Sequence, residues 1–181
     1  MIFTETRLSG VFIIDLDLNQ DARGFFARSF CQREFTEHGL LAHYPQCNLS
    51  YNRDRGTLRG LHFNRTPYEE AKLVRCQVGT IYDVVVDLRR GSKTLGQWLG
   101  VELSSQNRRQ LYIPKGCAHG ILTLTPHTEI FYQMSDFYVP GAGLGLRYDD
   151  PGIGIQWPEA PRVISERDRN YPDWHPEGED D

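Results

Sequence analysis

The 181-residue sequence contains no long hydrophobic run. A helix that crosses a membrane needs about 20 consecutive apolar residues, and no segment of this chain approaches that length. The first residues, Met1 to Glu5, also lack the charged and then apolar pattern of a signal peptide. We therefore expect a cytoplasmic protein that has no membrane partner.

Cysteine is scarce and scattered. Cys31, Cys47, Cys76 and Cys117 stand singly, without the CxxC spacing of many zinc sites or the density of a disulfide framework. Disulfide bonds and a structural zinc site are the less favoured alternatives. Reduced thiols agree better with a cytoplasmic protein.

Positive charge is not in surplus. The chain has 20 Lys and Arg residues against 24 Asp and Glu residues, for a net charge of −4. Nucleic acid requires a basic surface, so we expect no nucleic-acid partner. A site for a small anion must therefore be a local cluster of arginines and lysines.

The length suits one domain with a substantial core. The sequence shows no internal repeat and no low-complexity linker. We expect residues 1–181 to form a single domain, with a disordered tail from about residue 175, where the chain becomes rich in proline and acidic residues.

Helical patterns are rare, and short strand patterns take their place. Residues 31–39 predict the one short helix, residues 19–24 predict a turn, and residues 140–145 predict a loop. Many short strands separated by Gly and Pro turns indicate an all-β sandwich or barrel. The alternating or β-branched stretches that predict strands are residues 11–18, 25–30, 73–78, 81–88, 97–103, 109–113, 120–124 and 129–134, with residues 152–157 as one more candidate.

Some of these strands carry polar residues that an apolar interior does not favour. Burying cationic or titratable groups is costly unless an anionic ligand binds there. Because one face of each strand points into a barrel, His62, Lys72 and Tyr132 are predicted to converge on one cavity. Arg59 would point outward in a regular strand, although a bulge at Gly60 would turn it inward.

Plainer interpretations exist for each of these residues. A strand histidine is often a hydrogen-bonded core residue, and a strand tyrosine often only packs. The stem of a strand lysine often lies along apolar surface while its ammonium reaches solvent. Residue types alone leave both interpretations open.

Short motifs extend from about Val11 to Asp168 and carry a family resemblance. They are Asp21-Ala22-Arg23-Gly24-Phe25-Phe26, Gln46-Cys47-Asn48-Leu49-Ser50, Leu58-Arg59-Gly60-Leu61-His62-Phe63, Lys72-Leu73-Val74-Arg75, the run Asp83 to Arg89, the run Ile113 to Gly120, Tyr132 with Tyr138 and Pro140, Asp150-Pro151, and Ile155-Gln156-Trp157-Pro158. With these motifs the chain resembles the dTDP-4-dehydrorhamnose 3,5-epimerase family of cupins. The resemblance implies a cupin jelly-roll β-barrel or sandwich with short peripheral helices, assembled as a homodimer.

The resemblance also implies a reaction. The enzyme would invert C3, C5 or both in a 4-keto-6-deoxy sugar linked to a nucleoside diphosphate, without metal or cofactor. Removing a proton beside the C4 ketone gives an enolate, and inversion needs a base on one face and an acid on the other. By the resemblance, His62 is the base, Asp168 orients it, Lys72 stabilises the enolate oxygen, and Tyr132 is the acid.

Further residues are implied as substrate contacts. Guanidinium groups bind a diphosphate well, side-chain amides can contact the substrate, and an aromatic ring can stack on the base. His119 is implied as a pocket residue near the sugar, and Asp83 would orient it. The implied substrate-binding residues are Arg23, Phe26, Arg28, Gln46, Asn48, Arg59, His119 and Tyr138.

Two positions depart from the family pattern. Arg28 and Gly143 each stand where the family usually has a glutamate, and the first of these glutamates reads thymine. A guanidinium only donates hydrogen bonds, so it suits the acceptors of cytosine or guanine better than the N3–H of thymine. We therefore expect CDP first and GDP second as the nucleotide, unless Arg28 simply pairs with a neighbouring glutamate.

Other activities stay open at this point. Cupins often bind a metal through a His-x-His motif, but the second position here is Asn64, and His62 with His119 makes a poor site even with Glu69 and Glu70 nearby. The alternatives to an epimerase are a sugar-nucleotide 3,4-ketoisomerase and a non-catalytic sugar-nucleotide-binding cupin. The presence of Lys72 and Tyr132 argues against the ketoisomerase. A binding module would be expected to have lost His62 or Tyr132, and both are present.

Overall fold

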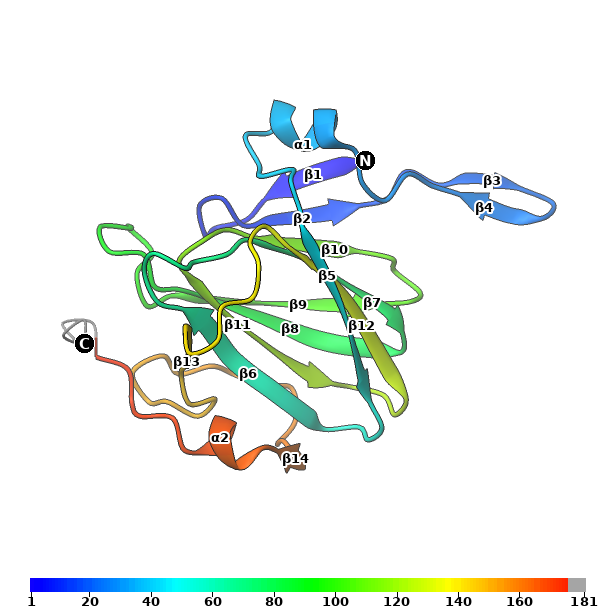
Figure 1. Cartoon of the computed structure of the whole chain (residues 1–181). Helices are drawn as coiled ribbons and strands as arrows, with labels where there is room; N and C mark the ends of the chain where they lie inside the picture. Colours follow the sequence, from blue (N-terminus) through cyan, green and yellow to red (C-terminus); the bar gives the residue numbers. More distant parts are fainter. Residues whose placement is uncertain (176–181) are drawn as a thin grey trace.

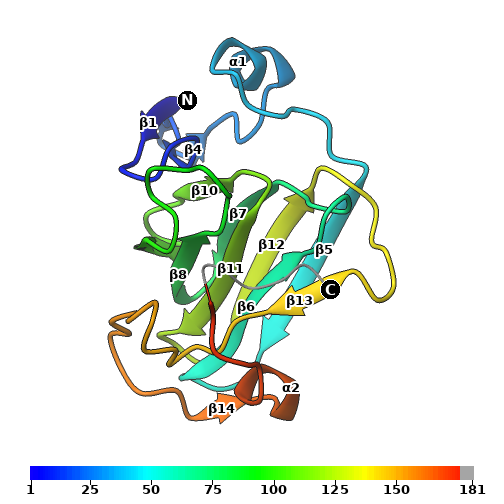
Figure 2. The ribbon, with the colours of Figure 1, turned by 90° about the vertical axis from the view of Figure 1, so that its left-hand side faces the viewer.

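The computed structural model describes residues 1–175, which fold into two antiparallel sheets packed face to face (Figures 1 and 2). The first sheet has the order β1 (Ile2–Glu5), β2 (Phe12–Asp15), β10 (Gln110–Ile113), β7 (Lys72–Val78), β12 (Thr128–Met134) and β5 (Gln46–Asn52). The second has the order β13 (Gly143–Gly145), β6 (Thr57–Asn64), β11 (Cys117–Thr123), β8 (Thr80–Asp87) and β9 (Trp98–Ser104), with β14 (Val163–Ile164) parallel to β6.

The remaining elements lie outside this sandwich. A hairpin of β3 (Asn19–Asp21) and β4 (Gly24–Phe26) projects from the body as an arm (Figure 1). The helices are α1 (Gln32–Glu37), beside β1 and β2, and α2 (Glu166–Arg169), beside β6. The expectation of an all-β sandwich with short peripheral helices is confirmed. Within residues 1–175, no helix is long and apolar enough to cross a membrane.

The hydrophobic core fills the space between the sheets. Val74, Leu111 and Ile130 from the first sheet meet Val85 and Ile121 from the second, and all five are almost completely buried. Burying a side chain of this size contributes about 1.5–3 kcal/mol. Strand alternation sends every second residue into this layer, so a polar residue at an inward position must face the core or a cavity within it.

The short helix occurs where the sequence predicts it. Phe35 is its one buried residue, and the ring packs against Phe3, Phe30 and Tyr44. The chain leaves the helix through Gly39 at φ +71°, a left-handed conformation that suits glycine. This cluster fastens the residues that follow the arm to the edge of the first sheet.

Three local predictions are corrected. Residues 19–24 were expected to form only a turn, but they pair as most of the β3–β4 hairpin, and regular strand structure ends at Phe26. Residues 143–145 pair with β6 instead of remaining a loop. Residues 152–157 do not form a strand, because Asp150 Oδ1 accepts the N–H groups of Gly152 (2.7 Å) and Ile153 (3.3 Å) and holds a turn. The predicted disordered tail falls largely on residues 176–181, outside the described residues.

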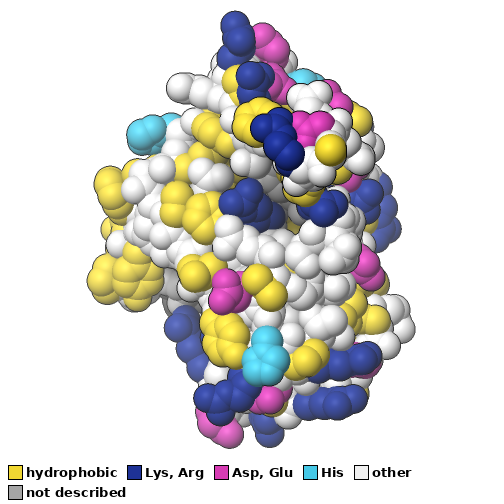
Figure 3. Space-filling model, turned by 90° about the vertical axis from the view of Figure 1, so that its right-hand side faces the viewer, with side chains coloured by type: hydrophobic (Ala, Val, Ile, Leu, Met, Phe, Trp, Pro, Cys, Tyr) yellow, Lys and Arg dark blue, Asp and Glu magenta, His cyan; other side chains and the backbone are white. Residues whose placement is uncertain are grey.

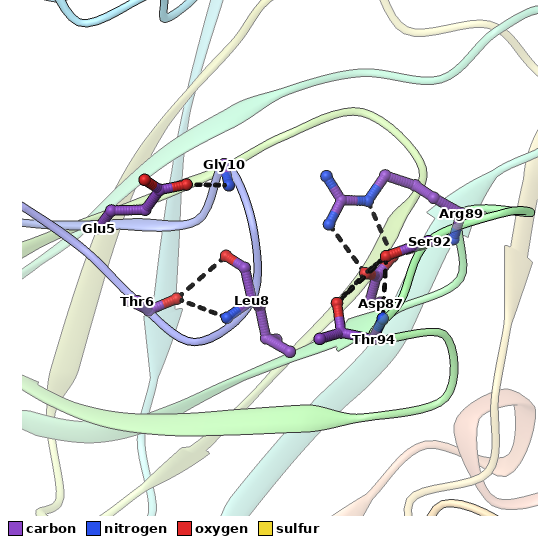
Figure 4. Close-up of polar contacts among 8 residues, drawn as sticks. All are labelled: Glu5, Thr6, Leu8, Gly10, Asp87, Arg89, Ser92 and Thr94. Carbon is purple, nitrogen blue, oxygen red and sulfur yellow. Dashed lines mark hydrogen bonds and ion pairs between the residues drawn. The ribbon is translucent and has the colours of Figure 1, made fainter.

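A buried carboxylate holds the turn between β8 and β9. Figure 4 shows the side chains of Arg89, Ser92 and Thr94 converging on Asp87. Arg89 Nε donates to Oδ1 at 2.8 Å, while the hydroxyls of Ser92 and Thr94 each donate to Oδ2 at 2.6 Å. Burial by itself raises the pKa of Asp87, but these hydrogen bonds outweigh it and hold the pKa well below its ordinary value.

This depressed pKa predicts an acid-sensitive contribution to stability. The stabilisation from Asp87 is fully present above the ordinary carboxyl pKa of 3.8 and is lost as pH falls toward the lower folded-state value. Asp87→Asn should therefore lower the free energy of unfolding by about 2 kcal/mol or more at pH 7, and less as the pH falls below about 4. Urea unfolding at several pH values measures this.

The control is Asp15→Asn, which removes a half-exposed partner of Arg109 at 3.0 Å. A surface pair of this kind contributes little, so a much smaller loss is expected. A loss for Asp87→Asn that stayed constant from pH 7 to pH 3 would contradict the prediction.

Candidate active site

A cavity of about 570 Å³ opens between the two sheets. The second sheet contributes Arg59 and His62 from β6 and His119 from β11, while the first contributes Lys72 from β7 and Tyr132 from β12. Residues of α2 close one side. As predicted from strand alternation, His62, Lys72 and Tyr132 all line this one cavity.

His62 and Asp168 form a hydrogen-bonded pair at this cavity. His62 Nε2 lies 2.8 Å from Asp168 Oδ1, and the backbone N–H of Gly60 donates to Asp168 Oδ2 at 3.1 Å. The histidine side chain is 42% exposed and the carboxylate 7%, so the ring is open to a ligand while its partner is not. Burial by itself raises the pKa of Asp168, but the hydrogen bonds from His62 and Gly60 outweigh it and keep the pKa below its ordinary value.

The carboxylate is placed by the start of α2. The hydroxyl of Ser165 caps this helix by accepting the N–H of Asp168 at 3.1 Å. A serine at this position is a favoured N-terminal cap. The 106 residues that separate His62 from Asp168 are bridged because β14, just before the helix, pairs with the start of β6.

A bulge brings Arg59 to the same face as His62. His119 on β11 pairs with His62, and Ile121 pairs with Arg59. Between these two pairs β6 therefore contains one residue more than β11, which is a β-bulge. Gly60 lies in the bulge at φ +117°, and a Cβ there would meet Gly120 Cα at 2.6 Å. Glycine is therefore required, and the inward turn of Arg59 expected from the sequence is found.

The opposite wall carries a phenol and an ammonium. Tyr132 pairs with Val74, and Met134 pairs with Lys72, so Tyr132 and Lys72 are diagonal neighbours on the inward face of β12 and β7. Burial raises the pKa of the Tyr132 hydroxyl, and the negative charge of Glu70 adds to this, while Arg59 and a hydrogen bond with Asn48 work in the opposite sense. At neutral pH the phenol is protonated and able to donate.

The ammonium of Lys72 has a carboxylate partner that we did not assign from the sequence. Its Nζ lies 3.2 Å from Glu70 Oε1, and both side chains are nearly buried. The other oxygen of Glu70 accepts from Asn64 Nδ2 at 3.0 Å. Glu70 stands two residues before Lys72, in the connection that precedes β7, where strand alternation does not apply, so no sequence signal indicated the pair.

His119 faces a second buried carboxylate. Its Nε2 lies 2.9 Å from Asp83 Oδ1, but the approach is outside hydrogen-bond geometry, and neither atom has another hydrogen-bond partner among residues 1–175. Asp83 is completely buried on β8, while the His119 side chain is 13% exposed. The predicted neighbours are therefore in close contact next to the cavity.

Only some of the residues expected near the diphosphate and the base lie at or beside the cavity. Gln46 and Asn48 lie on the face of β5 shared with Ser50, which lines the cavity, so they flank it. Gln46 Oε1 accepts the backbone N–H of Tyr138 at 3.0 Å, and the Tyr138 ring is exposed. Arg59 Nε donates to Asn52 Oδ1 at 2.7 Å and Nη2 to Tyr51 O at 3.4 Å, and the side chain lines the cavity.

Three predicted substrate contacts lie outside the cavity of their own chain. Arg23 lies at the tip of the arm, is 90% exposed and pairs with Asp21 at 2.5 Å. Phe26 is 73% exposed on the same arm. Arg28 lies just beyond it and pairs with Glu34 at 3.0 Å. The arm points away from the body in Figure 1, which is why the local motif did not predict their place.

Arg167 is a further cavity residue that sequence reasoning missed. It lines the cavity beside Asp168, and its Nη2 donates to Gly143 O at 3.1 Å. No sequence signal separates it from other arginines of the polar C-terminal region. Residues 1–175 contain no group of three or more His, Cys, Asp or Glu residues arranged to hold a metal ion.

The fold and the cavity define the class of protein, a cupin-type β-sandwich enzyme with groups for proton transfer on both walls. The sequence profile of the dTDP-4-dehydrorhamnose 3,5-epimerase family matches residues 5–175, and the chain belongs to this family. It is a carbohydrate epimerase, as the sequence predicts.

Individual relatives support the assignment. The dTDP-4-dehydrorhamnose 3,5-epimerase of Methanothermobacter thermautotrophicus is 44% identical over 172 residues, 93% of this chain and 92% of that protein. The crystal structure of the Bacillus anthracis enzyme with TDP and PPi bound has a TM-score of 0.92 and 38% identity, and covers 96% of this chain and 99% of that one. The Legionella pneumophila structure in complex with dTDP-4-keto-L-rhamnose has a TM-score of 0.86 and 38% identity, with coverage of 92% and 89%.

Proposed function

We propose that this chain epimerises C3 and C5 of a dTDP-linked 4-keto-6-deoxy sugar. The observation that carries the proposal is the placement of an imidazole–carboxylate pair on one wall of a single cavity and a phenol beside an ammonium on the other. A sugar ring held between these walls would meet a base on one face and an acid on the other.

The proposed mechanism starts at His62. Its Nε2–H donates to Asp168, so Nδ1 is free to take the proton from the carbon beside the C4 ketone. The C–H electron pair forms a double bond to C4, and the ketone oxygen becomes an enolate oxygen, which the Lys72 ammonium stabilises. Asp168 stabilises the imidazolium that forms.

Tyr132 would complete the inversion. Its phenol gives a proton to the opposite face of the enolate carbon, and the ketone is restored. The phenolate then regains a proton and the imidazolium loses one, through solvent. Repeating these steps at the second carbon beside the ketone inverts both centres.

The nucleotide is proposed to be dTDP rather than CDP or GDP. The expectation of CDP or GDP depended on a free guanidinium at Arg28, and that guanidinium is engaged by Glu34 at 3.0 Å. The relatives named above carry dTDP or TDP in their names and titles, which supports dTDP. Calorimetric titration with dTDP, CDP and GDP tests the choice, and preferential binding of CDP or GDP would overturn it.

Deuterium exchange tests the reaction itself. Incubation with dTDP-4-keto-6-deoxyglucose in D₂O should place deuterium at C3 and C5 and yield the inverted sugar by NMR. Exchange at one carbon alone would restrict the proposal to that centre. A 3,4-ketoisomerase would instead move the ketone to C3, and a binding module would bind the nucleotide sugar without any exchange.

A homodimer is the proposed assembly. Leu49 and Tyr51 on the outer face of β5 are 60% and 50% exposed, and Phe26 on the arm is 73% exposed. Figure 3 shows hydrophobic side chains spread over the side of the molecule toward which the arm projects. A second copy against this side would cover these residues and would receive the arm, which supports placing Arg23 and Phe26 at the cavity of the partner.

Complementation between inactive variants tests this arrangement. Heterodimers of Arg23→Ala with His62→Ala, purified through two different tags, should recover about half of the wild-type activity, because one of two symmetric sites would then be intact. The control pairs Lys72→Met with His62→Ala, which leaves a lesion in both cavities and should recover nothing. Failure of the first pair to recover activity would contradict an arm that acts on the partner.

A further inference from the structure

Glu70 is a nearly buried carboxylate between the two sheets. It lies in the connection between β6 and β7, and its side chain is 7% exposed. One oxygen meets Lys72 at the start of β7, at 3.2 Å, and the other accepts from Asn64 at the end of β6, at 3.0 Å. Each oxygen is thus engaged by a different sheet, so the carboxylate has one well-defined position.

That position determines where the Lys72 ammonium lies. A lysine stem is flexible, and its ammonium has three donors in no fixed direction. Glu70 takes one donor and leaves two for a ligand in the cavity that Lys72 lines. A donor held in place before the reaction is more effective than one that must be ordered during it.

The charge of Glu70 also acts on Tyr132. The phenol and Lys72 are diagonal neighbours, and the negative charge of Glu70 raises the pKa of Tyr132, after burial as the largest cause. Arg59 opposes it from β6. The other titratable or charged groups that line or adjoin the cavity are His62 on β6, His119 on β11, Asp83 on β8, and Arg167 and Asp168 on α2.

Building on the proposed function, we infer that Glu70 is a positioning residue that holds the Lys72 ammonium at the site of the enolate oxygen and, together with Lys72, sets the charge balance beside the Tyr132 phenol. It acts through these two residues and need not touch the substrate.

The kinetic test is Glu70→Gln, which keeps the shape of the side chain and an acceptor for Asn64 but removes the charge. We expect kcat to fall about tenfold or more while KM changes less than about threefold, since a displaced donor acts mainly in the transition state. In a Lys72→Met background the same substitution should add little to the loss of kcat. Fully additive losses in kcat would overturn the inference.

The matched control is Glu69→Gln at the adjacent position. Glu69 accepts from Thr66 at 2.7 Å and is not among the residues that line the cavity. Its kcat and KM should be those of the wild type. Thermal unfolding of each variant shows that the comparison is made between folded proteins.

A second readout does not depend on turnover. The Tyr132 titration is isolated as the difference in phenolate absorbance between each protein and the same protein with Tyr132→Phe. Glu70→Gln should move this titration to lower pH, and Glu69→Gln should leave it in place. An unchanged titration would overturn the inference even if the protein is an epimerase. A titration shifted to lower pH would support the inference even if the substrate is not the one proposed.

Should Glu70→Gln alone fail to fold because it leaves a buried ammonium unpaired, the pair of variants Lys72→Met and Glu70→Gln/Lys72→Met replaces it. Neither contains an unpaired buried ammonium, and in Lys72→Met the Glu70 carboxylate keeps the hydrogen bond from Asn64 at 3.0 Å. The phenol of the double variant should still titrate at lower pH than that of Lys72→Met, and equal titrations would overturn the inference.

Discussion

His62→Ala should lower kcat by about 10²–10⁴-fold, the usual contribution of a positioned general base. The ring is the exposed member of a pair with buried Asp168, and because Nε2 is turned to that carboxylate, Nδ1 is the nitrogen proposed as the base. Without it, the imidazole–carboxylate pair that takes the proton in the proposed mechanism is lost, so deuterium exchange into the sugar should stop as well. Turnover and exchange are both followed by NMR in D₂O.

Binding of the nucleotide sugar should change little in this variant, because the ring is not a diphosphate contact. The control is His38→Ala, which removes an exposed imidazole stacked on Phe3 at 4.0 Å, away from the cavity. It should retain wild-type kcat. Full activity in His62→Ala would remove the base from the proposed mechanism.

Tyr132→Phe should separate the two halves of the reaction. The base remains, so the enolate still forms and deuterium still enters the sugar, at a rate within about tenfold of wild type. The acid on the opposite face is missing, so the proton returns from the side it left. Inverted product should fall by about 10²–10⁴-fold. Exchange and product are measured in the same NMR experiment.

The matched control is Tyr44→Phe, which removes a phenol that donates to Leu41 O at 2.8 Å near α1. Both the exchange and the inversion should be unaffected by it. Loss of exchange together with inversion in Tyr132→Phe would mean that the phenol is needed to form the enolate, and the roles of His62 and Tyr132 would have to be reassigned.

The sequence was sufficient for the fold and for the centre of the site because both follow from local patterns. Strand alternation is a property of neighbouring residues, so it predicted that His62, Lys72 and Tyr132 face one interior. The sequence also allowed a bulge at Gly60. The structure contains it and shows why glycine is needed there, because a Cβ would meet Gly120 where the bulge turns Arg59 inward. The pairs His62–Asp168 and His119–Asp83 came from the family resemblance, and spacing could not have supplied them.

What the sequence by itself determined was which residues alternate into an interior and which segments turn. Only the tertiary structure decided which of these residues meet. Glu70 is an ordinary acidic residue until β6 and β7 bring Asn64 and Lys72 to its two oxygens. For Arg28 the sequence left two roles open, contact with the base or pairing with a glutamate, and α1 places Glu34 beside it. The physical reason is the same in each case: the contact joins groups on separate elements, and the free energy of an ion pair depends on distance and burial, which no local pattern contains.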